Sequence, residues 1–246
     1  MIKAVIFDLG GTLIEYAGTY QTWPLLETPG LKAAHQRLTA AGVTIPPLAQ
    51  FQERGFALLP GRWQQATAGE RNLRVAELIS EILAANGFAM PETAVLDEAA
   101  QAYEAAIQSQ AQPMDGAQAL LAELQANGYR LGLISNTMFR GAAHLADLAR
   151  FGLDGYFQAT LFSADANMWK PNRAPFTQMV TALAVPAAAA VYVGDDPAND
   201  VVGSQGAGLR AIHIRSSDRF AVPDSVRADA VINHLAELPA VLSSWQ

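Results

Sequence analysis

The chain has 246 residues, of which 51 % are hydrophobic and 16 % charged, so it can bury a sizeable core and is not expected to be disordered. Its net charge of −7 disfavours binding to nucleic-acid phosphates or to anionic membrane surfaces. The absence of cysteine excludes disulfides, cysteine–zinc sites and thiol catalysis. No run approaches the roughly 20 apolar residues of a membrane span, and Asp8 interrupts the N-terminal apolar run. We therefore expect a cytoplasmic enzyme or binding protein.

Short apolar runs rich in β-branched residues predict buried strands, of which the first covers residues 2–7. Similar runs follow at 129–134, 190–193 and 209–214, with a weaker one at 157–162. Helical patterns alternate with these strands, and they lie at 117–127, 142–150, 175–183 and 199–207. Such alternation predicts βαβ units, and therefore a Rossmann-like α/β core with a parallel sheet covered by helices on both faces.

Residues 15–112 interrupt this alternation. The segment contains helical patterns at 31–41, 71–86 and 92–110 but no convincing strand, and Pro46-Pro47, Pro60-Gly61 and Pro91 indicate breaks between its elements. We predict an all-helical cap domain at 15–112, inserted into a core formed by residues 1–14 and 113–246.

Polar residues follow several of the predicted strands directly. Asp8 follows the first strand, Ser135-Asn136 follows the run at 129–134, and Gly194 to Asp200 follows the run at 190–193. Lys170-Pro171 precedes the helix that leads into this last strand. Because ligands of open parallel sheets bind beyond the carboxyl ends of the strands, we expect these residues to converge on one site.

These residue types suit metal-assisted phosphoryl chemistry. Asp8 can act as nucleophile and metal ligand, and Asp195 can add a second hard oxygen ligand, a set that suits Mg²⁺. Ser135, Thr12 and the N–H groups of glycine-rich turns can bind phosphate oxygens. Lys170, one of three lysines, can neutralise both Asp8 and an incoming phosphate.

The chain resembles the haloacid dehalogenase-like hydrolase superfamily in four motifs that occur in the expected order. They are Phe7-Asp8-Leu9-Gly10-Gly11-Thr12-Leu13, Leu133-Ile134-Ser135-Asn136, Lys170-Pro171, and the segment from Val193 to Asp200. The helical insertion after the first motif is similar to the cap of phosphoglycolate-phosphatase-like members. The resemblance covers essentially the whole chain.

The resemblance implies a role for each of these residues. Asp8 would attack the substrate and form a covalent aspartyl intermediate, Ser135 would hold the transferred group, and Lys170 would orient the nucleophile. Asp195 would bind Mg²⁺, and Asp200 would be a further ligand or would hold the site in place. The full sets are Thr12, Ser135, Asn136 and Lys170 for phosphate, and Asp8, the Gly10 carbonyl, Asp195 and Asp200 for the metal. The expected activity is that of a Mg²⁺-dependent phosphatase of a small phosphorylated or otherwise anionic metabolite, in a monomer or homodimer.

Gly10 departs from the phosphatase pattern. Phosphatases of this superfamily usually carry a second aspartate there, which protonates the leaving group and then activates water, a contribution of about 10²–10⁴ in rate. Three interpretations stay open. The substrate has a good leaving group, such as an acyl phosphate; another group, with Glu15 as a candidate, replaces the acid; or the protein is a weak or non-hydrolytic relative that binds a phosphorylated ligand or partner.

Gly10 also admits other hydrolytic chemistry. Dehalogenases of the superfamily also lack the second aspartate. They need no metal, however, so the presence of Asp195 and Asp200 favours the metal-dependent branch. Phosphonoacetaldehyde-hydrolase-like members have a small residue at this position and a cap lysine, for which Lys32 would be the candidate. The larger cationic and aromatic residues of the insert are expected to be solvated or packed, so none is assigned to the site: Trp23, Arg54, Arg62, Trp63, Arg71 and Arg74.

Overall fold

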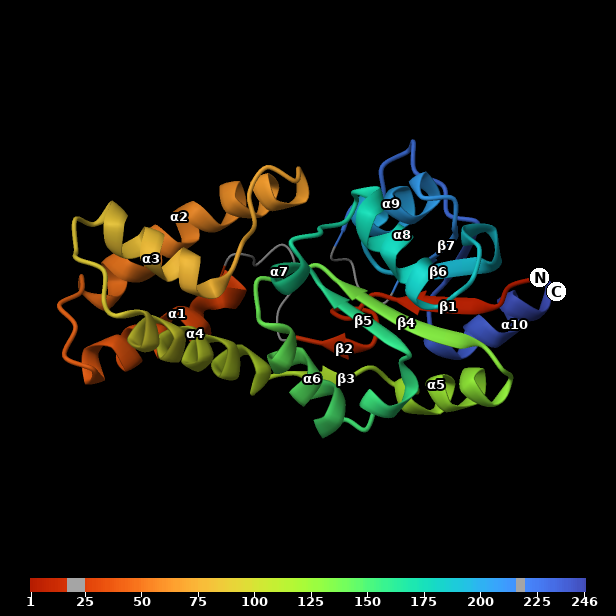
Figure 1. The fold of residues 1–246 in the computed structure, drawn as a ribbon, viewed down its shortest axis with the longest axis horizontal. Helices are drawn as coiled ribbons and strands as arrows, with labels where there is room; N and C mark the ends of the chain where they lie inside the picture. The colour runs from red at the N-terminus through yellow and green to blue at the C-terminus, as the bar shows by residue number, and fades with distance from the viewer. Residues whose placement is uncertain (17–24, 216–219) are drawn as a thin grey trace.

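Figure 1 shows the computed structural model of the chain, which describes residues 1–16, 25–215 and 220–246. Its main sheet has six parallel strands in the order β5-β4-β1-β6-β7-β8. The strands are β1 (Ala4–Phe7), β4 (Arg130–Ser135), β5 (Ala159–Phe162), β6 (Ala190–Gly194), β7 (Arg210–Ile214) and β8 (Ala230–Ile232). β1 is central, because it pairs with β4 on one side and β6 on the other. The five predicted strands are therefore present, and β8 is an additional edge strand.

Helices cover both faces of this sheet, because alternate residues of each strand point to opposite sides. Val5 and Phe7 of β1 belong to a core shared with α5 (Ala117–Ala126), α6 (Gly141–Arg150) and α10 (Leu238–Ser243). Ala4 and Ile6 face a second core built on α8 (Arg173–Ala182). The short helices α7 (Ser163–Ala166) and α9 (Gly203–Gly206) complete the α/β part. The predicted α/β class is confirmed.

Among the described residues between β2 and β3, a short 3-10 helix (Leu25–Glu27) and four α-helices form a separate bundle, here called the helical insert, which lies beside the sheet in Figure 1. The α-helices are α1 (Thr28–Ala40), α2 (Leu48–Thr67), α3 (Val75–Ala85) and α4 (Thr93–Gln108). Their packed faces bury residues from every helix, such as Leu31, Phe51, Ile79 and Tyr103. The insert is joined to the core by the antiparallel pair β2 (Ile14–Glu15) and β3 (Gln112–Pro113).

One predicted break is wrong. Pro60-Gly61 lies inside α2, which continues to Thr67. Proline removes one hydrogen bond of the helix, and the buried face of α2, which includes Gly55, Leu59 and Ala66, holds the helix together across it. No helix in the described ranges is both long enough and apolar enough for a membrane span.

Candidate active site

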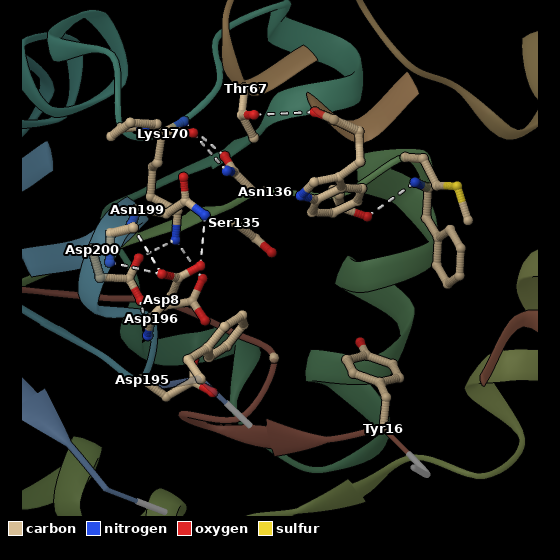
Figure 2. A pocket seen from close by; sticks show the side chains of 18 of the residues that line it. Asp8, Tyr16, Thr67, Ser135, Asn136, Lys170, Asp195, Asp196, Asn199 and Asp200 are labelled. Carbon is tan, nitrogen blue, oxygen red and sulfur yellow. Dashed lines mark hydrogen bonds and ion pairs between the residues drawn. The ribbon is translucent and has the colours of Figure 1, made fainter. Parts of the chain in front are cut away.

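The predicted strand-end residues meet at the carboxyl edge of three adjacent strands. Asp8 follows β1 and its N–H still donates to Val193 O of β6, at 2.9 Å. Ser135 ends β4, and Asp195 follows β6. All three side chains are buried and line one cavity. Figure 2 shows the labelled aspartates, Ser135, Asn136 and Lys170 on one side of this cavity.

Lys170 is the centre of the hydrogen-bond network. Its Nζ lies 2.6 Å from Asp8 Oδ1, 2.6 Å from Asp200 Oδ1 and 2.8 Å from the hydroxyl of Tyr192. The side chain is 2 % exposed, and these three contacts use the three N–H donors of the ammonium group. Burial lowers the pKa of Lys170, but the charges of Asp200 and Asp8 outweigh it and raise the pKa above its ordinary value. Lys170 therefore remains a cation that neutralises part of the carboxylate charge.

Asp200 is held on both of its oxygens. Oδ1 accepts from Lys170, and Oδ2 accepts from the Asp196 N–H at 3.0 Å. Burial raises the pKa of Asp200, and the charge of Asp8 adds to this while Lys170 opposes it. A Cβ at position 194 would lie 2.2 Å from Asp200 Oδ2, so only glycine at the end of β6 permits this placement.

Asp196 organises the loop after β6. Its Oδ1 accepts from the N–H groups of Ala198 and Asn199, at 2.9 and 3.0 Å, at the start of a π-helix covering Pro197–Val202. Burial, followed by the charge of Asp200, raises the pKa of Asp196. Asp196 therefore fixes the geometry that places Asp200 against Lys170.

The carboxylates fit a hard divalent cation. Asp8, Asp195 and Asp200 each offer an oxygen, and these atoms lie within 4.8 Å of one another. With Asp196, four carboxylates lie at this end of the cavity, and Lys170 is the one lysine among the described residues of the lining. Such an excess of buried negative charge is unfavourable without a counter-ion, and oxygen ligands are those that Mg²⁺ prefers.

The predicted phosphate ligands differ in their placement. Ser135 lines the cavity, whereas Thr12 is fully buried and lies outside the cavity lining. Asn136 forms a two-point contact with the backbone of Lys170: its Nδ2 donates to Lys170 O at 2.9 Å, and its Oδ1 accepts from Lys170 N–H at 2.8 Å. Its amide is therefore engaged in positioning Lys170, although its phosphate-binding role stays a prediction.

The helical insert forms the other wall of the cavity, whose volume is about 770 Å³. Trp63 and Thr67 of α2 and Ile107 of α4 contribute to this wall. The insert is held on the core by the Asn72 Nδ2 and Arg74 Nε groups, which both donate to Ala164 O at 2.9 Å. The cavity thus lies between two parts of the chain that are far apart in sequence.

A buried network next to Gly10 includes Tyr16. The Tyr16 hydroxyl donates to Asp147 Oδ2 at 3.1 Å and contacts His144 Nδ1 at 3.0 Å. Because the single hydroxyl proton goes to the carboxylate, Nδ1 must donate, and His144 Nε2 then accepts from Thr137 Oγ1 at 2.7 Å. Burial lowers the pKa of His144 to about 4, which is consistent with a neutral ring.

Sequence reasoning did not assign three residues that matter here. The Tyr192 hydroxyl accepts from Lys170 and donates to Ile134 O at 3.0 Å. A tyrosine within a buried strand could have indicated such a contact, because a buried hydroxyl needs a hydrogen-bond partner. Tyr16 and Trp63 line the cavity without a comparable sequence signal. Glu15 and the exposed Lys32 do not line it, so the structure offers no support for their suggested roles. Trp23 lies outside the described residues.

Comparison with known proteins identifies the class. The model of the haloacid dehalogenase-like hydrolase family matches residues 2–208, so the chain belongs to that family and is a hydrolase. The phosphoglycolate phosphatase of Yersinia pestis is 28 % identical over 243 residues, which are 98 % of this chain and 93 % of that protein. The ribulose-1,5-bisphosphate 5-phosphatase of Halopiger xanaduensis is 28 % identical over 256 residues, covering 99 % of this chain and all of that protein. The resemblance drawn from the four motifs is therefore confirmed.

A solved structure of a 2-haloacid dehalogenase from Pseudomonas syringae pv. Tomato DC3000 is also similar. Its TM-score is 0.72, its sequence identity is 29 %, and the match covers 100 % of both chains. This similarity extends over the α/β core and the helical insert together.

Proposed function

We propose that the protein is a Mg²⁺-dependent phosphatase that acts on a small phosphorylated metabolite in the cytoplasm through an aspartyl-phosphate intermediate. The observation that carries this proposal is the buried Lys170, which joins Asp8 to Asp200 through contacts of 2.6 Å while Asp195 lies within the same carboxylate cluster. A metal-independent dehalogenase has no need of such a cluster. The phosphatases among the similar proteins support the same activity.

Asp8 is the proposed nucleophile. Lys170 engages Oδ1, so Oδ2 is the oxygen that would attack phosphorus, forming the Asp8–phosphorus bond as the ester oxygen–phosphorus bond breaks. The leaving group departs with the bonding electron pair. Water then attacks the phosphorus of the intermediate as the Asp8 Oδ2–phosphorus bond breaks, both water protons end on the released phosphate, and the Asp8 carboxylate is regenerated.

The remaining residues would hold the phosphoryl group and the ion. Ser135 would bind phosphoryl oxygens whose charge grows in the transition state, and the nearby Lys170 cation would offset part of that charge without a direct hydrogen bond. Asp8, Asp195 and the Gly10 carbonyl would hold Mg²⁺, which when bound supplies positive charge at the phosphoryl oxygens. Asp200 would fix Lys170, since both of its oxygens already accept hydrogen bonds. Residues 15–112 would act as the cap that encloses the substrate.

The test is turnover of p-nitrophenyl phosphate with and without Mg²⁺ in the wild type and in Asp8→Asn, with circular dichroism to verify folding. We expect metal-dependent turnover that is lost in the variant. Turnover that survives Asp8→Asn would refute the mechanism. A folded wild type without turnover of any phosphate ester or acyl phosphate would instead indicate a non-hydrolytic relative.

Carbon–halogen hydrolysis is a second candidate, favoured by Gly10 and by the similar 2-haloacid dehalogenase structure. Halide leaves without a proton, so this reaction also needs no acid at position 10. Metal-independent release of halide from 2-chloropropionate, lost in Asp8→Asn, would select it over the phosphatase.

A further inference from the structure

The cavity extends well beyond the space that a phosphoryl group needs. Its volume of about 770 Å³ lies in the range of roughly 300–1,000 Å³ seen for drug-sized ligands. Apolar side chains from both parts of the chain line it, among them Leu26, Trp63, Ile107, Met138 and Phe139. A two-carbon leaving group such as glycolate would leave most of this apolar wall without contact.

The charges along the wall disfavour an anionic leaving group. Among the described residues that line the cavity, Lys170 is the only permanent cation, and its donors are directed to Asp8, Asp200 and Tyr192. The single charged side chain that the described part of the insert contributes is Glu27, a carboxylate. Within the described lining, a second carboxylate or phosphate on the substrate would therefore meet carboxylates and no cation with a free donor.

Position 10 offers no proton to the leaving group. The nearest described neighbour of a Cβ placed at Gly10 is the ring of Tyr16, at 3.7 Å. Tyr16 donates its hydroxyl proton to Asp147, so this proton is not directed to the substrate. A leaving group that is stable as an oxyanion does not need this proton, and a phenolic oxygen, with a pKa of about 10, meets that requirement far better than an alkoxide.

These three observations converge on one substrate class. We propose that the enzyme hydrolyses phosphate monoesters of uncharged aromatic hydroxyl compounds, whose ring packs against the apolar wall that includes Trp63 and Phe139. This inference rests on the proposed phosphatase function and specifies its substrate. It assigns the selection to cavity size, to wall charge and to the missing acid, and the last two contributions can be separated by choice of substrate.

The test compares kcat/KM for a matched set of esters. Phenyl phosphate carries all three favourable features, benzyl phosphate keeps the ring but has an alkoxide leaving group, and 4-carboxyphenyl phosphate keeps the phenolic oxygen but adds a charge. We expect phenyl phosphate to exceed benzyl phosphate by about 10²-fold or more, from the missing acid. We expect it to exceed 4-carboxyphenyl phosphate by about 10-fold or more, from the unpaired carboxylate.

A variant tests the charge argument independently. Thr67 lies on the insert side of the cavity, as Figure 2 shows, and Thr67→Arg would place a cation there, with Thr67→Gln as the uncharged control. The arginine variant should raise the ratio of 4-carboxyphenyl to phenyl phosphate turnover by about 10-fold, and the glutamine variant should not. An equal change in both variants would contradict the charge argument.

The result that overturns the proposal is distinct from failure of the phosphatase function. Turnover that depends on Asp8 but favours phosphoglycolate or benzyl phosphate over phenyl phosphate would overturn the substrate class alone. No turnover of any ester would overturn the substrate class and the phosphatase function together.

Discussion

Replacing Gly10 with aspartate should create the acid that the site lacks. A Cβ at this position would meet Tyr16 Cδ2 at 3.7 Å and Cε2 at 3.8 Å, which are ordinary van der Waals contacts, and the backbone there has no left-handed φ. The variant should therefore fold. The new carboxyl would lie beside an aromatic ring and close to Asp8, two features that raise a carboxyl pKa and favour its protonated, proton-donating form.

The expected gain depends on the leaving group. General acid catalysis contributes about 10²–10⁴ in rate, which is roughly 3–5 kcal/mol of activation free energy, when the leaving group needs a proton. We expect Gly10→Asp to raise kcat/KM for benzyl phosphate by a factor in this range. Phenyl phosphate should change by less than about 10-fold, because phenoxide leaves without protonation.

The assay is steady-state phosphate release from both esters, measured as a function of pH. Gly10→Asn is the matched control, because it adds a side chain of the same size that is not a comparable proton donor. The benzyl phosphate rate of Gly10→Asp should fall at high pH as the new carboxyl ionises. An equal gain in Gly10→Asn, or no gain in a folded Gly10→Asp, would refute the reasoning.

Three further predictions follow from the same site. Because water activation also lacks its base, the wild type should accumulate phosphorylated Asp8 during turnover, and intact-mass measurement at partial conversion that finds only unmodified protein would contradict this. Mg²⁺ at about 100 times its Kd should stabilise the fold by about 2.7 kcal/mol, and thermal unfolding with Mg²⁺ and with EDTA should show the difference in the wild type but not in Asp195→Asn. Burial lowers the pKa of His144 to about 4 in the folded protein. As the pH falls below about 6.5, the imidazole is therefore protonated in the unfolded chain before it is protonated in the folded one. Between pH 6.5 and 4 the free energy of unfolding should decrease by roughly 3 kcal/mol more in the wild type than in His144→Gln, as measured by urea denaturation, and equal slopes would contradict this.

The strand-end residues were predictable because a parallel sheet imposes their placement. Asp8, Ser135 and Asp195 each follow an apolar run, and β4, β1 and β6 are neighbours with carboxyl ends on the same side. Once the runs are assigned to one parallel sheet, the three side chains must lie at one edge. The partnership of Lys170 with Asp200 was harder to predict, since an aspartate near a helix start can equally serve as a cap.

Other features depend on tertiary packing that local patterns do not encode. β8 has three residues at the sheet edge, and only Ile232 is fully buried, so its pattern is too short to recognise. Trp63 reaches the cavity because α2 continues through Pro60, where a local rule indicates a break. The role of Tyr16 depends on contacts with His144 and Asp147, which are more than a hundred positions away in the sequence.

The short pair β2–β3 has a consequence for how this fold can be altered. Ile14 pairs with Pro113 and Glu15 with Gln112, so the chain leaves the α/β core and returns to it at adjacent positions. A segment with neighbouring ends can be exchanged for one of different length at a small entropic cost, because loop-closure free energy rises only slowly with length. The junction therefore serves as a grafting point, at which a different recognition module can be attached to the same catalytic framework without changing the order or register of the six-stranded sheet.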